Sequence, residues 1–335
     1  MIRENFLFKL DSNINELLEI AYSFEKARVF LTACEFGVFD TLGDDFKTAE
    51  EVAEVVKAHP KALGRLMNAL VSMNLLDKKS GKYCNTKLTN AYLVKANPNF
   101  IGNLKYINDI WNRWSNLTES IKTGTAVNYI EPGNRPKEQL EEFISAMHWR
   151  ANFQAPELIK MINLSKVTKI LDLGGGSGAY AVEMAKAKQN IDAYVFDLPE
   201  VVPIAEKYIQ FKGFDGKVKT IAGNFKTDKI GKGYDLVFVS HILHSNSFYD
   251  NIELLRKVYD SLKVGGTIVI HDFIIDDDRS SPEFQSLFSL NMLVSTPAGD
   301  VMTDTDIWIL LKECWFSSIE KKDTPFGSSL MFGTK

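Results

Sequence analysis

Apolar side chains recur at intervals of three and four residues between about residues 12 and 76, which predicts consecutive amphipathic helices. Gly37 ends the second helix. Thr48 and Glu51 match a capping box, in which two side chains bind free backbone N–H groups at a helix start. Pro60 opens a further helix, since proline fits the first helical turn. The apolar positions of the first two helices are Ile14, Leu17, Leu18, Ala21 and Phe24, then Val29, Leu31, Ala33 and Phe36.

A small hairpin is predicted after these helices, at residues 78–83, with Ser80 and Gly81 at its turn. Short helices followed by a hairpin describe a winged-helix unit, which can bind DNA or serve as a packing and dimerisation module. The helix at 60–73 has no basic stripe, and the whole chain carries a formal net charge of −4. Because nucleic-acid binding normally needs a basic surface, the sequence favours the dimerisation role.

Residues 98–163 are rich in aromatic side chains at helical spacing, and a loop at 128–136 divides them. Aromatic residues at such spacing are either core or pocket residues. We expect Trp111, Trp114 and His148 to contact a bound substrate.

The pattern changes at Lys169, where apolar runs of strand length begin to alternate with helical stretches. Such alternation predicts a parallel sheet covered by helices on both faces, with ligands at the carboxyl ends of the strands. Two further strands are expected at 317–333. The predicted strands are 169–173, 193–196, 218–221, 236–239 and 267–271, and the predicted helices lie near 179–188, 200–210 and 249–263.

The length of 335 residues and these patterns predict three parts. They are a winged-helix dimerisation domain at 1–97, a helical linker and pocket region at 98–165, and a catalytic domain at 166–335. The three cysteines, Cys34, Cys84 and Cys314, offer neither a disulfide framework nor a C-x-x-C metal motif. We expect no signal peptide, no membrane span, and a cytoplasmic location.

A glycine-rich loop joins the first predicted strand of the catalytic part to the next helix. It reads Asp172-Leu173-Gly174-Gly175-Gly176-Ser177-Gly178. Glycines let the backbone approach a ligand closely, and the helix start points free N–H groups toward it. Asp197 ends the next strand about 20 residues further on, where a carboxylate can bind both ribose hydroxyls. A nucleoside-like cofactor is therefore expected here.

The same glycine pattern also satisfies the fingerprint of NAD-binding proteins, so an NAD-dependent enzyme is a competing interpretation. The discriminating residue is Asp172. A carboxylate beside the loop would repel a diphosphate, whereas it would attract the positive charges of S-adenosylmethionine. This acid favours S-adenosylmethionine as the cofactor.

The chain resembles the small-molecule O-methyltransferases that include hydroxyindole, caffeate, flavonoid and bacterial natural-product enzymes. The resemblance covers nearly the whole chain and follows the family's order of motifs. In the N-terminal part it rests on Phe36-Gly37-Val38-Phe39-Asp40, Thr48-Ala49-Glu50-Glu51-Val52-Ala53 and 63–70, and in the catalytic part on 172–178, Phe196-Asp197-Leu198-Pro199, Gly223-Asn224-Phe225, Ile242-Leu243-His244 and Gly265-Gly266.

The resemblance implies a class I S-adenosylmethionine-dependent methyltransferase fold, a Rossmann-like α/β sheet with an N-terminal winged-helix dimerisation domain, acting as a homodimer. It implies that His244 is the general base, that Asp272 positions it, and that Met292 shapes the substrate pocket. The cofactor-binding residues that it and the loop imply are Asp172, Gly174, Gly176, Gly178, Asp197, Leu198, Asn224, Phe225 and Ser240.

Five positions depart from the family's pattern. Ser245-Asn246 replaces an Asp-Trp pair whose tryptophan flanks the adenine. Ser240 replaces a cofactor-contacting lysine, and Asn224 replaces an aspartate near the adenine amine. Val301 stands where plant members have a second acid.

Two other histidines lie near the expected base. His241 is a candidate pocket residue that contacts substrate. His271 is expected to be structural, since alternation along its strand points it away from the face that presents Asp272. His241, His244 and Asp272 lack the spacing of a metal motif, so we expect no metal.

These features predict a methyltransferase that modifies a hydroxyl of a small aromatic or heteroaromatic molecule, such as a hydroxyindole, hydroxybenzimidazole or polyketide phenol. Within the same fold, the alternatives are carbon methylation and a non-methylating decarboxylase or hydroxylase. From a different class, the alternative is a DNA-binding regulator that senses S-adenosylmethionine. Neither nucleic acid nor a membrane is an expected partner.

Overall fold

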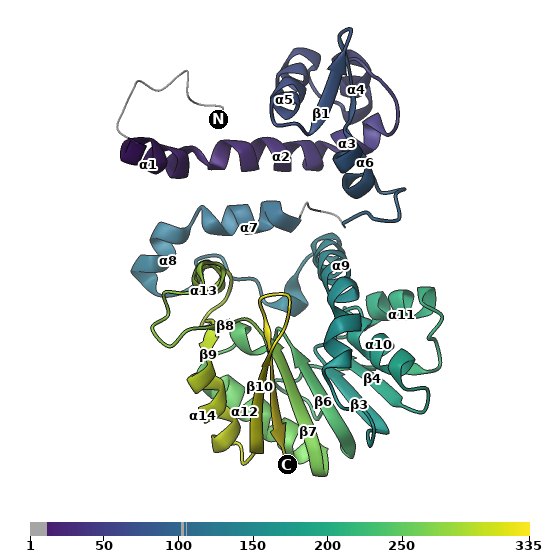
Figure 1. Ribbon diagram of the computed structural model, residues 1–335, viewed down its shortest axis with the longest axis vertical. Coiled ribbons are helices and arrows are strands. Elements are labelled where there is room, and N and C mark those ends of the chain that lie inside the picture. Colours follow the sequence, from purple (N-terminus) through teal and green to yellow (C-terminus); the bar gives the residue numbers. More distant parts are fainter. Residues whose placement is uncertain (1–11, 102–103, 105) are drawn as a thin grey trace. The chain divides into compact units, whose positions relative to one another are not determined.

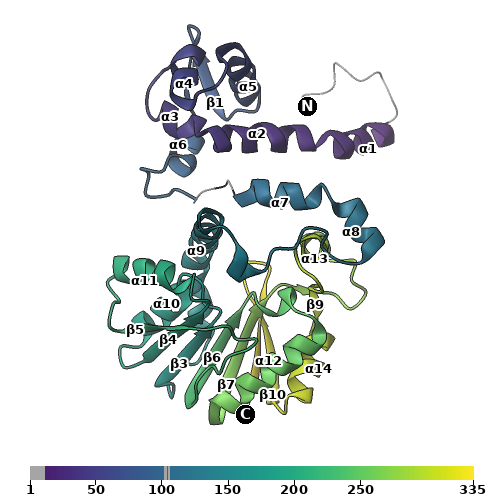
Figure 2. The same cartoon turned by 180° about the vertical axis from the view of Figure 1, so that it is seen from behind.

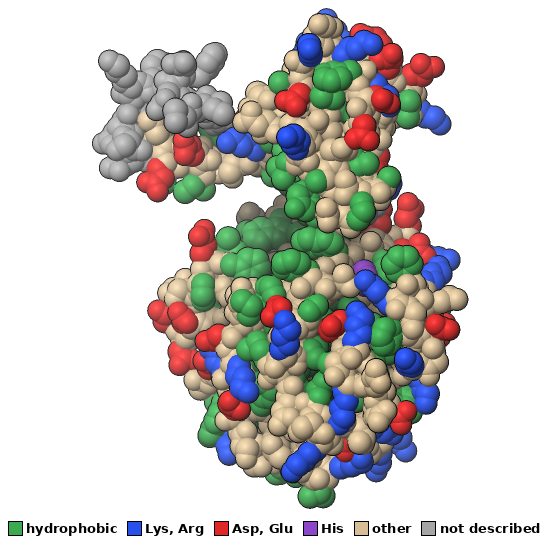
Figure 3. Space-filling view, turned by 45° about the vertical axis from the view of Figure 1, so that its right-hand side comes forward, with side chains coloured by type: hydrophobic (Ala, Val, Ile, Leu, Met, Phe, Trp, Pro, Cys, Tyr) green, Lys and Arg blue, Asp and Glu red, His purple; other side chains and the backbone are tan. Residues whose placement is uncertain are grey.

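The computed structural model of the protein describes residues 12–101, 104 and 106–335. It contains two compact units, whose boundary in the sequence lies between Asn108 and Asp109 (Figure 1). Among the described residues, no helix is both long enough and apolar enough to cross a membrane. On the face of the second unit seen in Figure 3, basic and acidic side chains are interspersed.

The first unit consists of helices around a two-stranded antiparallel hairpin, as the sequence predicts. Helix α7 (Tyr106–Trp114) spans the boundary between the units. The remaining elements are α1 (Ser12–Tyr22), α2 (Phe24–Phe36), α3 (Val38–Leu42), α4 (Ala49–Val56), α5 (Pro60–Ser72), β1 (Leu76–Lys79), β2 (Lys82–Asn85) and α6 (Lys87–Leu93).

Local signals in the sequence fix the ends of several of these elements. Gly37 ends α2 in the left-handed conformation, with φ of 69°. Thr48 and Glu51 form the predicted capping box at the start of α4. Ser80 and Gly81 turn the hairpin with φ of 50° and 79°. These helices bury one apolar core, which includes Leu42, Val52, Ala53, Leu63, Met67 and Leu70.

The second unit is built on a seven-stranded mixed sheet in the order β10-β11-β7-β6-β3-β4-β5. The five strands from β3 to β7 pair in parallel, and the C-terminal hairpin of β10 and β11 adds to the edge in antiparallel fashion. The strands are β3 (Lys169–Leu173), β4 (Asp192–Asp197), β5 (Val218–Ala222), β6 (Tyr234–Ser240), β7 (Leu262–Asp272), β10 (Ser317–Asp323) and β11 (Ser329–Thr334).

Helices cover both faces of this sheet (Figures 1 and 2). Alternate residues of each strand enter different cores: Ile170 of β3 packs with α9, α10 and α11, whereas Leu171 packs with α12 and α14. The helices are α8 (Leu117–Thr123), α9 (Lys137–Lys160), α10 (Ala179–Ala187), α11 (Val202–Phe211), α12 (Phe248–Ser261), α13 (Glu283–Ser295) and α14 (Asp304–Glu313), with short 3-10 turns η1 (Pro132–Asn134) and η2 (Leu243–Ser245).

Several elements between 274 and 313 were not predicted from the sequence. They are helices α13 and α14 and the two-residue parallel strands β8 (Ile274–Ile275) and β9 (Met302–Thr303). Helix α13 has apolar side chains around most of its circumference, so its sequence lacks the alternation of apolar and polar faces that marks a surface helix.

The parallel strands place the predicted site residues at one edge of the sheet. Gly174 follows β3, and Asp197, Ser240 and Asp272 are the last residues of β4, β6 and β7. Carboxyl ends of parallel strands are where ligands bind in such folds. The fold therefore gathers four of the expected residues from a stretch of about 100 residues.

Candidate active site

The glycine loop between β3 and α10 has a backbone conformation that lets a ligand approach it closely. Gly174, Gly176 and Gly178 have φ of 67°, 56° and 75°, which side chains other than glycine rarely adopt. A Cβ atom on Gly174 would lie 2.5 Å from Cδ1 of Ile242. The loop thus needs glycine for its backbone conformation and, at Gly174, for space as well.

Asp172 lies under this loop with its side chain fully buried. One carboxylate oxygen accepts a hydrogen bond of 3.2 Å from the Ala181 N–H, and the other has no partner among the described residues. Burial raises the pKa of Asp172 to about 7, and the charge of Asp197 adds to this effect, while the Ala181 bond opposes it. A buried carboxylate with an unused oxygen is suited to a cationic ligand.

Asp197 organises the same loop from the end of β4. Its two carboxylate oxygens accept hydrogen bonds of 2.7 Å each from the N–H groups of Gly176 and Leu198. Burial raises the pKa of Asp197 to about 6, although both backbone bonds lower it. Two neighbouring acids with raised pKa values beside the glycine loop fit a positively charged nucleoside such as S-adenosylmethionine and disfavour a diphosphate.

Of the other predicted cofactor-binding residues, Phe225 lies against the glycine loop, whereas the side chains of Asn224 and Ser240 contact other parts of the protein. Phe225 and Ile242 lie against Gly174. The side-chain oxygen of Asn224 accepts a bond of 2.9 Å from the Lys226 N–H within its own turn. The Ser240 hydroxyl is 2.9 Å from Nδ1 of His271, a residue with no exposed surface.

A histidine and a carboxylate meet where β6 and β7 end. Nδ1 of His244 lies 2.6 Å from Oδ1 of Asp272, and both side chains are buried. Burial alone would raise the pKa of Asp272, but the charge of His244, the hydrogen bond from its ring and the contact with His241 hold that pKa well below its usual range. Asp272 is therefore ionised, and Nε2 of His244 makes no hydrogen bond to any described residue.

His241 reaches the same carboxylate from the residue that follows β6. Its Nδ1 lies 3.4 Å from Oδ1 of Asp272, and its Nε2 is buried without a partner in the described part of the chain. The donor atoms of His241, His244 and Asp272 lie within 4.8 Å of one another, close enough to hold a metal ion. However, two ligands of one zinc ion lie about 3 Å apart, so the 2.6 Å contact has the length of a hydrogen bond. The absence of a metal stays a prediction.

His271 faces the opposite side of the sheet from Asp272, as strand alternation predicts. Its two ring nitrogens lie 2.9 and 2.8 Å from the hydroxyls of Ser240 and Ser328. Burial lowers its pKa well below the ordinary value, and the charge of His241 adds to that effect. A neutral ring bonded to two hydroxyls is a structural element of the core.

Aromatic side chains surround the histidine pair. The ring of Phe288 stands edge-on to that of His244 at 5.0 Å between centroids, and Phe273 lies 4.8 Å from His241. Phe284 and Phe288 stack along one face of α13, on which Met292 is also buried. The sequence analysis named Met292 as a pocket residue, which stays a prediction, and named neither phenylalanine, although their four-residue spacing is visible in the chain.

The residues of α7 and α9 that we expected to contact substrate do not all lie beside the same part of the protein. Nε1 of Trp114 donates a hydrogen bond of 3.0 Å to Asn291, next to Met292 in α13, and Trp111 is half-buried in α7. His148 instead contacts the glycine loop: its Nδ1 lies 2.8 Å from the Ser177 hydroxyl. Its ring stacks on Tyr208 at 3.9 Å, and burial lowers its pKa to about 4.

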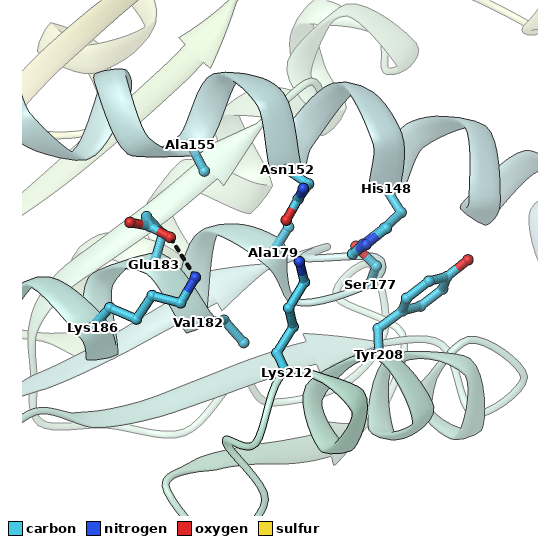
Figure 4. A pocket seen from close by; sticks show the side chains of 10 residues that line it. All are labelled: His148, Asn152, Ala155, Ser177, Ala179, Val182, Glu183, Lys186, Tyr208 and Lys212. Carbon is cyan, nitrogen blue, oxygen red and sulfur yellow. Dashed lines mark hydrogen bonds and ion pairs between the residues drawn. The ribbon is translucent and has the colours of Figure 1, made fainter. Parts of the chain in front are cut away.

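His148 lines a groove between α9, α10 and α11, which Figure 4 shows from close by. The groove also contains Asn152, Ser177, Lys186 and Lys212. Neither His244 nor Asp272 lines this groove. His148 is therefore not part of the cluster formed by Asp272, His241 and His244.

Comparisons with known proteins agree with this architecture. A family model described as O-methyltransferase domain matches residues 120–317, and one described as O-methyltransferase dimerisation domain matches residues 18–95. A 3-hydroxy-5-methyl-1-naphthoate 3-O-methyltransferase from Streptomyces sahachiroi is 31% identical over 84% of this chain and 83% of its own length. An acetylserotonin O-methyltransferase from Macaca mulatta is 31% identical over 94% and 95%.

More distant similarities extend the same comparison. An N,N-dimethyltransferase, OxyT, from Streptomyces rimosus is 29% identical over 78% of both chains. The crystal structure of human N-acetylserotonin methyltransferase in complex with S-adenosylmethionine superimposes with a TM-score of 0.85, at 27% identity, covering 98% of this chain and 99% of that one. The predicted fold, family and cofactor are thereby confirmed: the chain belongs to the O-methyltransferase family with an N-terminal dimerisation domain, and it is an S-adenosylmethionine-dependent O-methyltransferase.

Proposed function

We propose that the enzyme methylates a hydroxyl of a small aromatic or heteroaromatic acceptor, with His244 as the general base. The observation that carries this proposal is the 2.6 Å contact between His244 and an ionised Asp272, beside the ring of Phe288. The named activities of the relatives, which act on a hydroxynaphthoate, a tetracenomycin precursor and acetylserotonin, support an aromatic acceptor. Examples of this class are hydroxyindoles, hydroxybenzimidazoles and polyketide phenols.

The bound S-adenosylmethionine supplies the methyl group that the acceptor oxygen takes up. Residues of the chain align the oxygen and remove its proton. With Nδ1–H donating to Asp272, Nε2 of His244 is free to accept the hydroxyl proton, and the carboxylate then balances the charge of the imidazolium. Phe288 and Met292 would pack against the acceptor ring, with Trp111, Trp114 and His241 as further pocket residues.

The cofactor would lie on the glycine loop. We assign Asp197 and Leu198 to contacts with its ribose and adenine. Asp172, which is buried under the loop, would attract the positive charge of the cofactor's methionine part. Gly174, Gly176 and Gly178 let the backbone approach, and Phe225 would flank the ligand. Asn224 and Ser240 already use their side-chain oxygens within the protein, so their contribution would be smaller. The Asp197 carboxylate accepts two backbone bonds but has further lone pairs that ribose hydroxyls can use. His148 supports the loop through Ser177 in this assignment.

We further propose a homodimer that forms through the first unit. The dimerisation domain at 18–95 supports this, as do exposed apolar residues of α1, where Leu17 and Ile20 are 68% and 67% exposed. The division of the chain at 97 and 165 stays a prediction. All three cysteines are free thiols, which suits a reducing compartment such as the cytoplasm.

The affinity for S-adenosylmethionine should fall as the pH is lowered from 8 to 5. A cationic ligand favours the ionised forms of Asp172 and Asp197, whose pKa values in the free protein are about 7 and about 6, so binding releases protons in this range. Calorimetry in two buffers of different ionisation enthalpy measures both effects. Asp172→Asn should remove the dependence near pH 7, while Asp192→Asn, at the exposed start of β4, should keep it. An affinity that is constant from pH 5 to 8 would rule out this assignment of the acids.

Replacing His244 by alanine should slow methyl transfer by about 10²–10⁴-fold, the usual contribution of a general base, while the affinity for S-adenosylmethionine stays nearly unchanged. Turnover is measured with a panel of phenolic acceptors, and cofactor binding by calorimetry. The matched control is His59→Ala, because His59 is an exposed histidine of the first unit. Wild-type turnover of the His244→Ala variant at pH 7 would show that the acceptor ionises without a protein base. Methylation of amines but not of phenols would instead point to the chemistry named for the OxyT relative.

Phe288→Ala should raise the KM for an aromatic acceptor by about threefold to tenfold, as expected for the loss of one aromatic contact. Cofactor affinity should not change, because, among the described residues, the ring contacts of Phe288 are with His244, Phe273 and Phe284 and include no residue of the glycine loop. Phe211→Ala is the control, since its ring is 84% exposed in α11. The assignment of the acceptor pocket fails if both variants have the KM of the wild type.

A further inference from the structure

Three nitrogen atoms lie close to Oδ1 of Asp272. This oxygen lies 2.6 Å from Nδ1 of His244, accepts the Phe273 N–H at 2.9 Å and lies 3.4 Å from Nδ1 of His241. Its second oxygen accepts a longer bond of 3.4 Å from the His244 N–H. The carboxylate is therefore flanked by two imidazole rings, only one of which the proposed mechanism uses.

His241 adopts an unusual backbone conformation to reach this carboxylate. Its φ is 55°, a region that few residues other than glycine occupy, although histidine and asparagine tolerate it better than most. A backbone bond of 2.8 Å from its N–H to the His271 carbonyl holds that conformation. Its ring is packed between those of His271 and Phe273, at 4.5 and 4.8 Å. The backbone, the packing and the contact with Asp272 all fix one orientation of the ring.

The charge states determine what His241 can donate. Burial lowers the pKa of His241, and the charges of His244 and Arg150 add to this effect, whereas the close carboxylate of Asp272 opposes it. A neutral imidazole has one N–H, and the neighbouring carboxylate favours placing it on Nδ1. Nε2 then carries a buried lone pair that no donor of the described residues reaches, so it is available to a donor group of a bound acceptor.

We propose that His241 is a positioning residue for the base: its Nδ1–H donates to the Asp272 oxygen that also accepts from His244, and so fixes the carboxylate between two imidazoles. The inference rests on His244 being the base. A carboxylate that accepts a second N–H carries less charge toward His244, so it stabilises the imidazolium less strongly. His241 would thus keep Asp272 in place and tune how readily His244 releases its proton after each turnover.

The test compares two substitutions that both suit a positive φ. His241→Gly removes the ring and its N–H, whereas His241→Asn retains an N–H donor close to the position of Nδ1. The charged and titratable groups facing His241 are Asp272 and His271 from β7, His244 from η2 and Arg150 from α9, and all remain in both variants. Calorimetric binding of S-adenosylmethionine verifies that each variant is folded.

His241→Gly should lower kcat by about 10- to 100-fold, as for the loss of a hydrogen bond to a charged group, with unchanged cofactor affinity. The acid limb of its kcat–pH profile should move to higher pH, because Asp272 then holds the His244 proton more tightly. His241→Asn should recover most of kcat and return the limb toward its wild-type position. A wild-type profile for the glycine variant, or an asparagine variant no better than glycine, would reduce His241 to a packing residue.

Three further outcomes distinguish the role of His241 from that of His244 and from metal binding. If His244→Ala retains turnover, the proposed function fails, and His241 has no base to position. If His244 is required but His241→Gly behaves as wild type, only the inference about His241 fails. Loss of activity on dialysis against EDTA, with recovery on adding Zn²⁺ alone, would mean that the three side chains hold a metal ion, and it would overturn the hydrogen-bonded arrangement.

Discussion

The buried carboxylate of Asp272 is the constraint around which the active site is built. An ionised carboxylate away from water is costly unless hydrogen bonds and nearby positive charge compensate it. Here His244, His241 and the Phe273 N–H all approach one of its oxygens. The same contacts that stabilise the charge also orient the imidazole of the proposed base, His244.

The acids beside the glycine loop, where we place the cofactor, have pKa shifts in the opposite direction to that of Asp272. Asp172 accepts one backbone bond and Asp197 accepts two, yet burial raises the pKa values of both acids. In the free protein these two carboxyl groups are therefore partly protonated near neutral pH, and a cationic cofactor would favour their ionised forms. The acids differ because imidazole rings contact Asp272, whereas, among the described residues, backbone N–H groups alone bind Asp172 and Asp197 and do not offset the cost of burial.

Much of the fold could be predicted because its signals are local. The capping box at Thr48 and the turn at Ser80-Gly81 depend only on neighbouring residues, and both are present in the structure. The pair of His244 and Asp272 was expected from the family resemblance alone, which also suggests their roles. The topology explains why they meet, because the two residues follow or end adjacent parallel strands.

The remainder depends on contacts between distant segments, which no local pattern records. The Ser240 hydroxyl lies beside His271, and His148 lies beside Ser177, since β7 and the glycine loop pass those positions. Helix α13 has no polar face to reveal its period, so the ring of Phe288 beside His244 could not be placed from the sequence. The contact of His241 with Asp272 requires a positive φ that the sequence does not indicate.

The most direct test of the account is the tautomer of His244 in the folded enzyme. The chain has only five histidines, so ¹⁵N-labelled histidine gives an NMR spectrum that single substitutions can assign. A proton on Nδ1 of His244, shifted downfield by its short bond to Asp272 and coupled to an unprotonated Nε2, is the predicted result near neutral pH. A proton on Nε2, with Nδ1 unprotonated, would contradict the account, because Asp272 would then neither orient the imidazole nor leave it free to accept a proton.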